Sequence, residues 1–110
     1  MTPSRLVQVV TTLPGDSNAR DIAEVLVAGG LAACAQIDGP ITSIYRWKGE
    51  LSSGREWRLV LKTPGSHAGR LRARLLELHP YEVPEMIQSD IDLVHDEYAE
   101  WAEGGGAGRD

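Results

Sequence analysis

The sequence predicts an α+β domain: a four-stranded antiparallel sheet with two helices on one face and a short C-terminal helix. Segments rich in β-branched residues alternate with segments whose apolar residues recur every three or four positions, in the order β-α-β-β-α-β. Gly and Pro separate most of these segments. The chain has 110 residues, about the size of one domain. The predicted order is that of the ferredoxin-like split β-α-β sandwich.

The first strand and the first helix are predicted in the N-terminal quarter of the chain. Residues 5–13 are rich in valine and threonine, which favour a strand. Apolar residues in 19–27 fall on one helical face, and Asp16 or Ser17 can cap the start of this helix. Two glycines then end it.

Two further strands are predicted to form a hairpin in the middle of the chain. Residues 31–47 predict the second strand, and the sequence of residues 38–40, Asp-Gly-Pro, allows a break within it. Residues 48–50 are a candidate turn, and residues 55–63 predict the returning strand.

The second helix, the fourth strand and the last helix complete the predicted order. Ser66 can cap the second helix, and Pro80 ends it because the residue before a proline disfavours helical backbone. Residues 85–94 predict the fourth strand, and residues 95–102 a short helix capped by Asp96. The apolar stripe of the second helix consists of Ala68, Leu71, Leu75 and Leu78.

The predicted domain comprises residues 1–102, and residues 103–110 are expected to form a flexible tail because they contain little apolar surface to bury. Two tryptophans on strands, Trp47 and Trp57, need cover that a small subunit cannot easily supply. We therefore expect the protein to bind to itself.

Composition narrows the class of partners. The net charge of −5 opposes binding to nucleic-acid phosphates. No apolar run approaches the roughly 20 residues that span a bilayer, so we expect no membrane partner. One cysteine allows no internal disulfide, which fits a reducing compartment. We expect a cytoplasmic protein.

Five short motifs occur in order along the chain: LAAC at 31–34, SIYRWKGE at 43–50, LVLKT at 59–63, HPYEVPE at 79–85 and YAEW at 98–101. Together they resemble the CutA divalent-cation tolerance proteins over about residues 5–102. The resemblance implies a ferredoxin-like subunit, a tight homotrimer, and a link to copper and other divalent metals. It implies no reaction, so we do not expect an enzyme.

Three residues are candidate metal ligands. His79 offers an imidazole nitrogen at a helix end, and Cys34 a thiolate that suits soft ions such as copper. Glu85 offers a carboxylate on a segment that proline stiffens. The alternatives are that His79 caps the last helix carbonyls and that Cys34 is a small buried apolar residue. A divalent cation is expected as ligand, and no organic cofactor.

The homotrimer that the resemblance implies has clefts between its subunits. The resemblance places Lys62 in such a cleft. The Tyr81 hydroxyl is expected to be hydrogen-bonded, and Glu56 to be a solvated charge. The residues expected to line the clefts are Tyr45, Trp47, Glu56, Lys62 and Tyr81.

The chain departs from the family pattern at two positions. Some CutA proteins have a cysteine near the end of the first strand and a second histidine beside the loop histidine. Thr11 and Leu78 stand at these positions here. If the family uses those donors for metal, this chain has lost two of them.

The predicted fold is shared by proteins with functions other than metal binding. The resemblance extends to PII signalling proteins, so a non-catalytic trimeric sensor or scaffold that binds a small ligand between subunits is the alternative function. An acylphosphatase would need an arginine in the loop after the first strand, and residues 11–18 (TTLPGDSN) offer none before Arg20. An RNA-recognition domain would need aromatic residues in a basic context on its third strand, which here contains one tryptophan.

Overall fold

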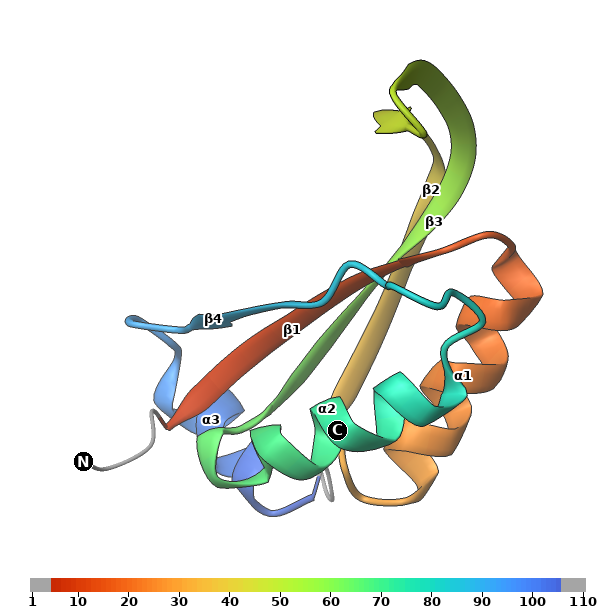
Figure 1. Cartoon of the computed structure of the whole chain (residues 1–110). Coiled ribbons are helices and arrows are strands. Elements are labelled where there is room, and N and C mark those ends of the chain that lie inside the picture. Colours follow the sequence, from red (N-terminus) through yellow and green to blue (C-terminus); the bar gives the residue numbers. More distant parts are fainter. Residues whose placement is uncertain (1–4, 106–110) are drawn as a thin grey trace.

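A computed structural model describes residues 5–105 and contains the predicted order of elements (Figure 1). This order confirms the predicted α+β class. The elements are β1 (Leu6–Leu13), α1 (Asp16–Ala28), β2 (Cys34–Trp47), β3 (Glu50–Pro64), a 3₁₀ turn (Gly65–His67), α2 (Ala68–Leu78), β4 (Ile87–Asp90) and α3 (Asp96–Glu103).

The four strands form one antiparallel sheet in the order β2-β3-β1-β4. Helices α1 and α2 lie side by side across one face of it (Figure 1). On β1, Val9 and Leu13 point into the core beneath these helices. Because side chains alternate along a strand, Gln8 and its partner Lys62 on β3 point to the opposite face.

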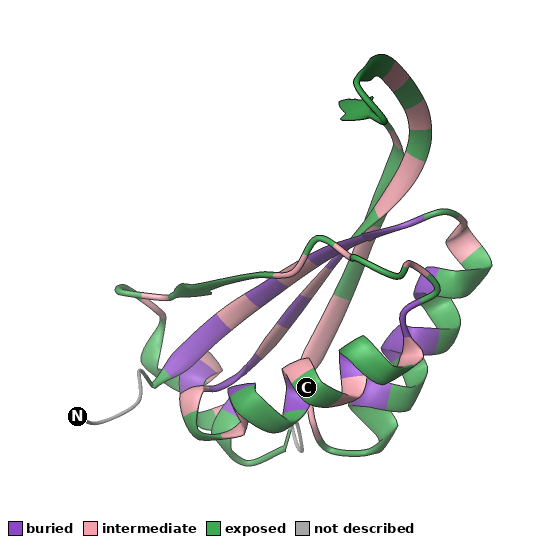
Figure 2. Ribbon diagram, viewed as in Figure 1, coloured by how far each residue is buried: buried purple, intermediate pink, exposed green. Residues whose placement is uncertain are grey.

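The core lies between the helices and the two inner strands. Leu59 and Leu61 of β3 are fully buried against Leu26 of α1 and against Leu71 and Leu75 of α2. Burial is concentrated on these facing surfaces, whereas the far half of the hairpin is open to solvent (Figure 2). Apolar burial between the helices and one sheet face is therefore the main source of stability.

The β2–β3 hairpin projects beyond the rest of the sheet (Figure 1). Its turn is Lys48-Gly49, with φ angles of 50° and 80°, as a two-residue type I′ turn requires. The chain does not break at residues 38–40. Instead, a bulge lies between Asp38 and Ile41, where a side chain on Gly39 would come within 2.6 Å of the Trp57 ring. Glycine is needed at this close approach.

The observed starts of the helices differ from the predicted caps. Helix α1 begins after Gly15, whose extended backbone ends the preceding loop, so Asp16 lies inside the first turn and pairs with Arg20. Ser66 lies inside the 3₁₀ turn, and Asp96 is the first residue of α3. Acidic residues in a first turn still interact favourably with the helix dipole.

β3 and β4 differ most in length from their predicted ranges, and β2 begins at Cys34, three residues later than predicted. β4 covers only Ile87–Asp90, and these four residues pair with the segment of β1 from Val7 to Val10. β3 is longer than predicted, because the bulged β2 continues to pair with it up to the turn. Pairing across the sheet, which local sequence does not report, sets both lengths.

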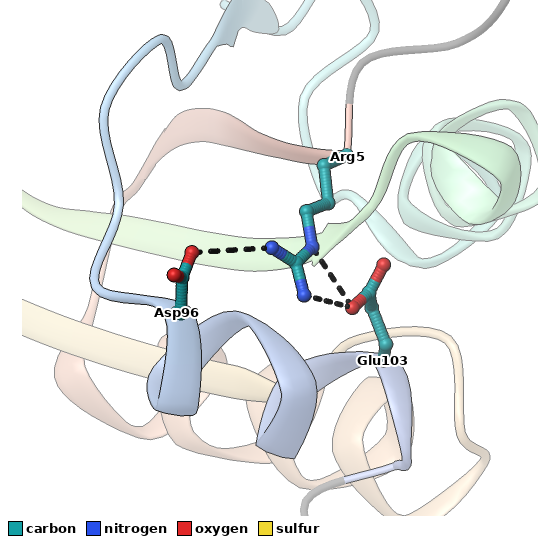
Figure 3. Close-up of polar contacts among 3 residues, drawn as sticks. All are labelled: Arg5, Asp96 and Glu103. Atoms are coloured by element: carbon teal, nitrogen blue, oxygen red, sulfur yellow. Dashed lines mark hydrogen bonds and ion pairs between the residues drawn. The ribbon is translucent and has the colours of Figure 1, made fainter.

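An ion-pair cluster fixes α3 to the start of β1 (Figure 3). The Arg5 guanidinium lies 2.9 Å from a Glu103 carboxylate oxygen and 3.5 Å from one of Asp96, so it reaches both ends of the helix. Leu6 is buried beneath the same helix, against Ala99 and Ala102. Glu103 thus belongs to α3, while residues 106–110 of the predicted tail lie outside the described residues.

Two leucines of α2 provide a test of this core. Leu71 is fully buried, and Leu76 is 56% exposed. We expect Leu71→Ala to lower the free energy of unfolding by about 2–5 kcal/mol, because it leaves a cavity. We expect Leu76→Ala to change it by less than about 0.5 kcal/mol. Urea denaturation followed by circular dichroism measures both, and equal losses would contradict this packing.

Candidate functional site

His79 lies at the junction between α2 and the loop that leads to β4. Helix α2 ends at Leu78, and His79 adopts an extended backbone with φ −71° and ψ 132°, as a residue before proline prefers. Its side chain is only 8% exposed. The predicted helix end is therefore confirmed, and it places the imidazole inside the protein.

Both nitrogens of the His79 ring take part in hydrogen bonds. The Tyr81 backbone N–H donates to Nδ1 at 3.1 Å, so Nδ1 must be unprotonated in this geometry. The Nε2–H then points at the Thr12 carbonyl oxygen, 3.0 Å away, and the Thr11 hydroxyl oxygen, 2.9 Å away. The Thr11 hydroxyl itself donates to the Glu85 carbonyl at 2.7 Å. The His79 side chain thus joins the loop to β1, and its hydrogen bonds do not go to the last carbonyls of α2.

The surroundings of His79 favour its neutral form. Burial lowers the pKa of the imidazole below its ordinary value, while the hydrogen bond to the Thr12 carbonyl and the charge of Glu56 oppose this only in part. A neutral imidazole is the form that can bind a metal. Here, however, ligation at either nitrogen would have to replace an existing hydrogen bond.

Tyr81 and Glu56 link the loop to the base of the hairpin. The Tyr81 hydroxyl donates to a Glu56 carboxylate oxygen at 2.8 Å, which confirms the expected hydrogen bond. Burial, this bond and the charges of Glu56 and Tyr45 raise the pKa of Tyr81 to about 12. The expectation that Glu56 is a solvated charge is wrong, because β1 ends opposite Trp57 and leaves Glu56 within reach of the loop.

Cys34 and Lys62 lie on the opposite face of the sheet from His79. Cys34 pairs with Lys62 across β2 and β3, and Lys62 pairs with Gln8. This row faces away from α1 and α2, whereas Thr11, the hydrogen-bond partner of His79, points to the same face as the core residue Val9. The first two predicted metal ligands are therefore separated by the sheet.

The structure brings the predicted site residues into two groups. His79, Tyr81, Glu56 and Tyr45 gather where the loop meets the hairpin. Cys34 and Lys62 share a pocket on the other face. Trp47 lies apart from both, next to the hairpin turn, with 61% of its surface exposed.

The Glu85 side chain is exposed, and the backbone carbonyl of this residue contacts the His79 group through Thr11. Within residues 5–105, no three His, Cys, Asp or Glu side chains are close enough to surround one metal ion. Metal binding by His79, by Cys34 and by Glu85 stays a prediction, and His79 and Cys34 of one subunit do not share a site.

Sequence reasoning missed several residues of these groups. The Thr11 hydroxyl is a direct hydrogen-bond partner of His79. In the sequence, Thr11 is notable only because it stands where some CutA proteins have a cysteine. Gln8, Gln36 and Tyr98 line the pocket with Cys34 and Lys62. Gln8 pairs with Lys62, and Gln36 lies two residues from Cys34, so side-chain alternation places both on the face of Lys62. This inference needs the strand pairing, which the sequence alone did not supply.

Comparison with known proteins decides the family. The model of the family described as CutA1 divalent ion tolerance protein matches residues 7–104. The chain belongs to the CutA1 family. The divalent-cation tolerance protein CutA of Thermus thermophilus is 42% identical over 93 residues, which cover 84% of this chain and 90% of that protein.

Solved CutA structures have the same fold. CutA of Xylella fastidiosa is 33% identical and superposes with a TM-score of 0.90 over 93% of this chain and 98% of its own. A CutA of Archaeoglobus fulgidus, described as periplasmic, is 26% identical, with a TM-score of 0.87 over 92% and 98% of the two chains. The CutA fold that the motifs implied is thereby confirmed. Each helix within residues 5–105 is too short or too polar to cross a membrane.

Burial of His79 predicts how stability depends on pH in this CutA1 family member. Because its pKa is lowered in the folded state, the unfolded chain binds the proton more readily. Neutral, buried His79 contributes its full share of the free energy of unfolding above pH 6.5, the ordinary imidazole pKa. We expect this share to be lost as the pH drops through the lowered pKa of His79 in the folded protein. Urea denaturation at several pH values, with EDTA present, measures this slope.

His79→Gln should flatten the slope, whereas His95→Gln should leave it unchanged, since the His95 side chain is 75% exposed. An identical slope in all three proteins would show that His79 is not the responsible group.

Proposed function

We propose that this CutA1 family member is a non-catalytic cytoplasmic protein that contributes to divalent-cation tolerance by binding divalent ions, chiefly copper, as a homotrimer. The observation that supports it is the family match over residues 7–104, together with relatives named divalent-cation tolerance proteins. The single cysteine agrees with a reducing compartment. We propose no organic cofactor.

The proposed ligands are His79, Cys34 and Glu85. Imidazole and thiolate donors suit copper, and carboxylate oxygens suit harder ions. Since the sheet separates Cys34 from His79 within one subunit, they would serve different sites. Each site would need further donors, which a neighbouring subunit could supply.

The exposed hairpin supports assembly into a homotrimer. Ile44, Trp47 and Leu51 are exposed by 71%, 61% and 84%, which a subunit alone would leave in water. β2 and β4 are the edge strands of the sheet and offer unpaired backbone groups to another chain. We propose that Tyr45, Trp47, Glu56, Lys62 and Tyr81 line the clefts between subunits.

The second candidate function is a trimeric sensor or scaffold that binds a small molecule in these clefts. The observation that favours it is the pocket that contains Cys34 and Lys62, because this pocket is already formed in the single subunit. In that case metal binding would be incidental.

Metal binding is expected to be saturable and to depend on the proposed ligands. Titration of Cu(II) and Zn(II) under native mass spectrometry should give a fixed ratio of ions per trimer. His79→Ala or Cys34→Ser should lower that ratio, whereas His95→Ala, at an exposed histidine, should not. Binding unaffected by the first two variants would favour the second candidate.

The substitution Thr11→Cys tests whether a thiol beside His79 increases Cu(II) binding. The Thr11 hydroxyl oxygen lies 2.9 Å from Nε2 of His79, so a thiol there would add a soft donor beside the imidazole. Tighter Cu(II) binding in Thr11→Cys that is lost in the double variant with His79→Ala would locate a metal site at this position. No gain would argue against metal binding by His79.

The molar mass of the protein in solution tests the proposed homotrimer. Sedimentation equilibrium should give about 36 kDa, three times the 12.0 kDa chain. Leu51→Glu should shift the population towards monomer, because it places a charge where an apolar contact is proposed, and Leu93→Glu, at a residue 93% exposed, serves as the control. A wild-type monomer at micromolar concentration would remove the clefts and the proposal with them.

A further inference from the structure

A pocket of about 360 Å³ lies on the sheet face that α1 and α2 leave uncovered. Its floor is a row of three side chains on adjacent strands: Cys34 on β2, Lys62 on β3 and Gln8 on β1. Gln36, two residues along β2, points to the same face. Polar groups from three strands therefore converge on one cavity.

The wall of the pocket is apolar and comes from the C-terminal part of the chain. Ile91 and Val94 precede α3, and the Tyr98 ring extends from its first turns, packed against Trp101. The ion pairs from Arg5 to both ends of α3 hold this wall against the sheet (Figure 3). The cavity thus has a polar floor and an ordered apolar wall, the combination typical of small-molecule sites.

The charge in the pocket is opposite to that of the whole protein. The net charge of the chain is −5, yet among residues 5–105 those that line the pocket include no Asp or Glu. Lys62 supplies the positive charge. Its ammonium group donates to the Gln36 side-chain oxygen, and this bond uses one of the three N–H donors of an ammonium.

We propose that this pocket binds a small organic monocarboxylate with an apolar tail. The Lys62 ammonium pairs with the carboxylate, the side-chain amide of Gln8 donates a second hydrogen bond, and Ile91, Val94 and Tyr98 contact the tail. The proposal rests on the second candidate function and names its ligand class. It is independent of metal binding by His79, which lies on the other face, but it excludes metal binding by Cys34, which lies in the same pocket.

The residues of the pocket favour a carboxylate over other ligands. One ammonium balances one negative charge, whereas a phosphate monoester carries nearly two and is usually bound by several cationic or backbone donors. A metal cation would meet the charge of Lys62 with no carboxylate to offset it. The volume is at the lower end of the range for ligand pockets, which limits the ligand to a small molecule.

The probes are hexanoate, the neutral hexanamide and hexyl phosphate, each titrated into the full-length protein with EDTA present. Amide shifts in ¹H–¹⁵N spectra report binding. We expect saturable hexanoate binding that shifts residues of β1–β3 and α3. Hexanamide and hexyl phosphate should each bind at least about tenfold more weakly, since a hydrogen bond to a charged group contributes about 1.5–3 kcal/mol.

The two lysines of the chain provide the matched pair of variants. Lys62→Met removes the charge and keeps the length of the side chain, and Lys48→Met does the same at the hairpin turn. Hexanoate binding should weaken at least about tenfold in the first and stay unchanged in the second. Lys62→Arg should retain binding, which guards against loss through misfolding.

Other outcomes would overturn the proposal. Equal binding of hexanoate and hexanamide would leave a small-molecule pocket but refute its selectivity for anions. Tighter binding of hexyl phosphate would assign the pocket to another class of anion. If none of the three probes binds, this proposal fails, whereas the second candidate function, which requires no carboxylate, is still decided by the metal titration of the His79 and Cys34 variants.

Discussion

The register of the β1–β3 ladder is the constraint on which the rest of the structure depends. Pairs such as Gln8 with Lys62 and Val9 with Leu61 fix which side chains point towards the helices. A slip of one residue would turn Leu59 and Leu61 out of the core and Lys62 into it. That slip would cost the burial of two leucines and bury an unpaired charge, so apolar burial itself selects the register.

The same alternation divides the chemistry of the protein between two faces. On the helix side, the buried His79 ring joins the loop after α2 to Thr11 and to the Thr12 backbone. On the open side, Cys34 and Lys62 share a pocket. A single subunit therefore cannot combine the thiol and the imidazole in one metal site, and functions of this CutA1 family member that need both would have to use contacts between subunits.

Hydrogen bonds tie the loop of residues 79–85 to β1 and β3. His79 accepts from the Tyr81 backbone, Tyr81 donates to Glu56 at the base of the hairpin, and the Glu85 carbonyl accepts from Thr11. These bonds connect the loop after α2 to β3 at the base of the hairpin and to β1. A ligand that displaced His79 would thus alter the contact between the loop and the hairpin.

The sequence by itself determined the order of the elements, the apolar face of each helix, the hairpin turn and the end of α2 before Pro80, because these follow from local periodicity and backbone preference. The five motifs also identified the family. Only the tertiary structure decided that β4 is short, that Thr11 meets His79, and that Gln8, Gln36 and Tyr98 surround Lys62. Those contacts join residues that are distant in the chain, and strand pairing and helix packing, which no local pattern encodes, bring them together.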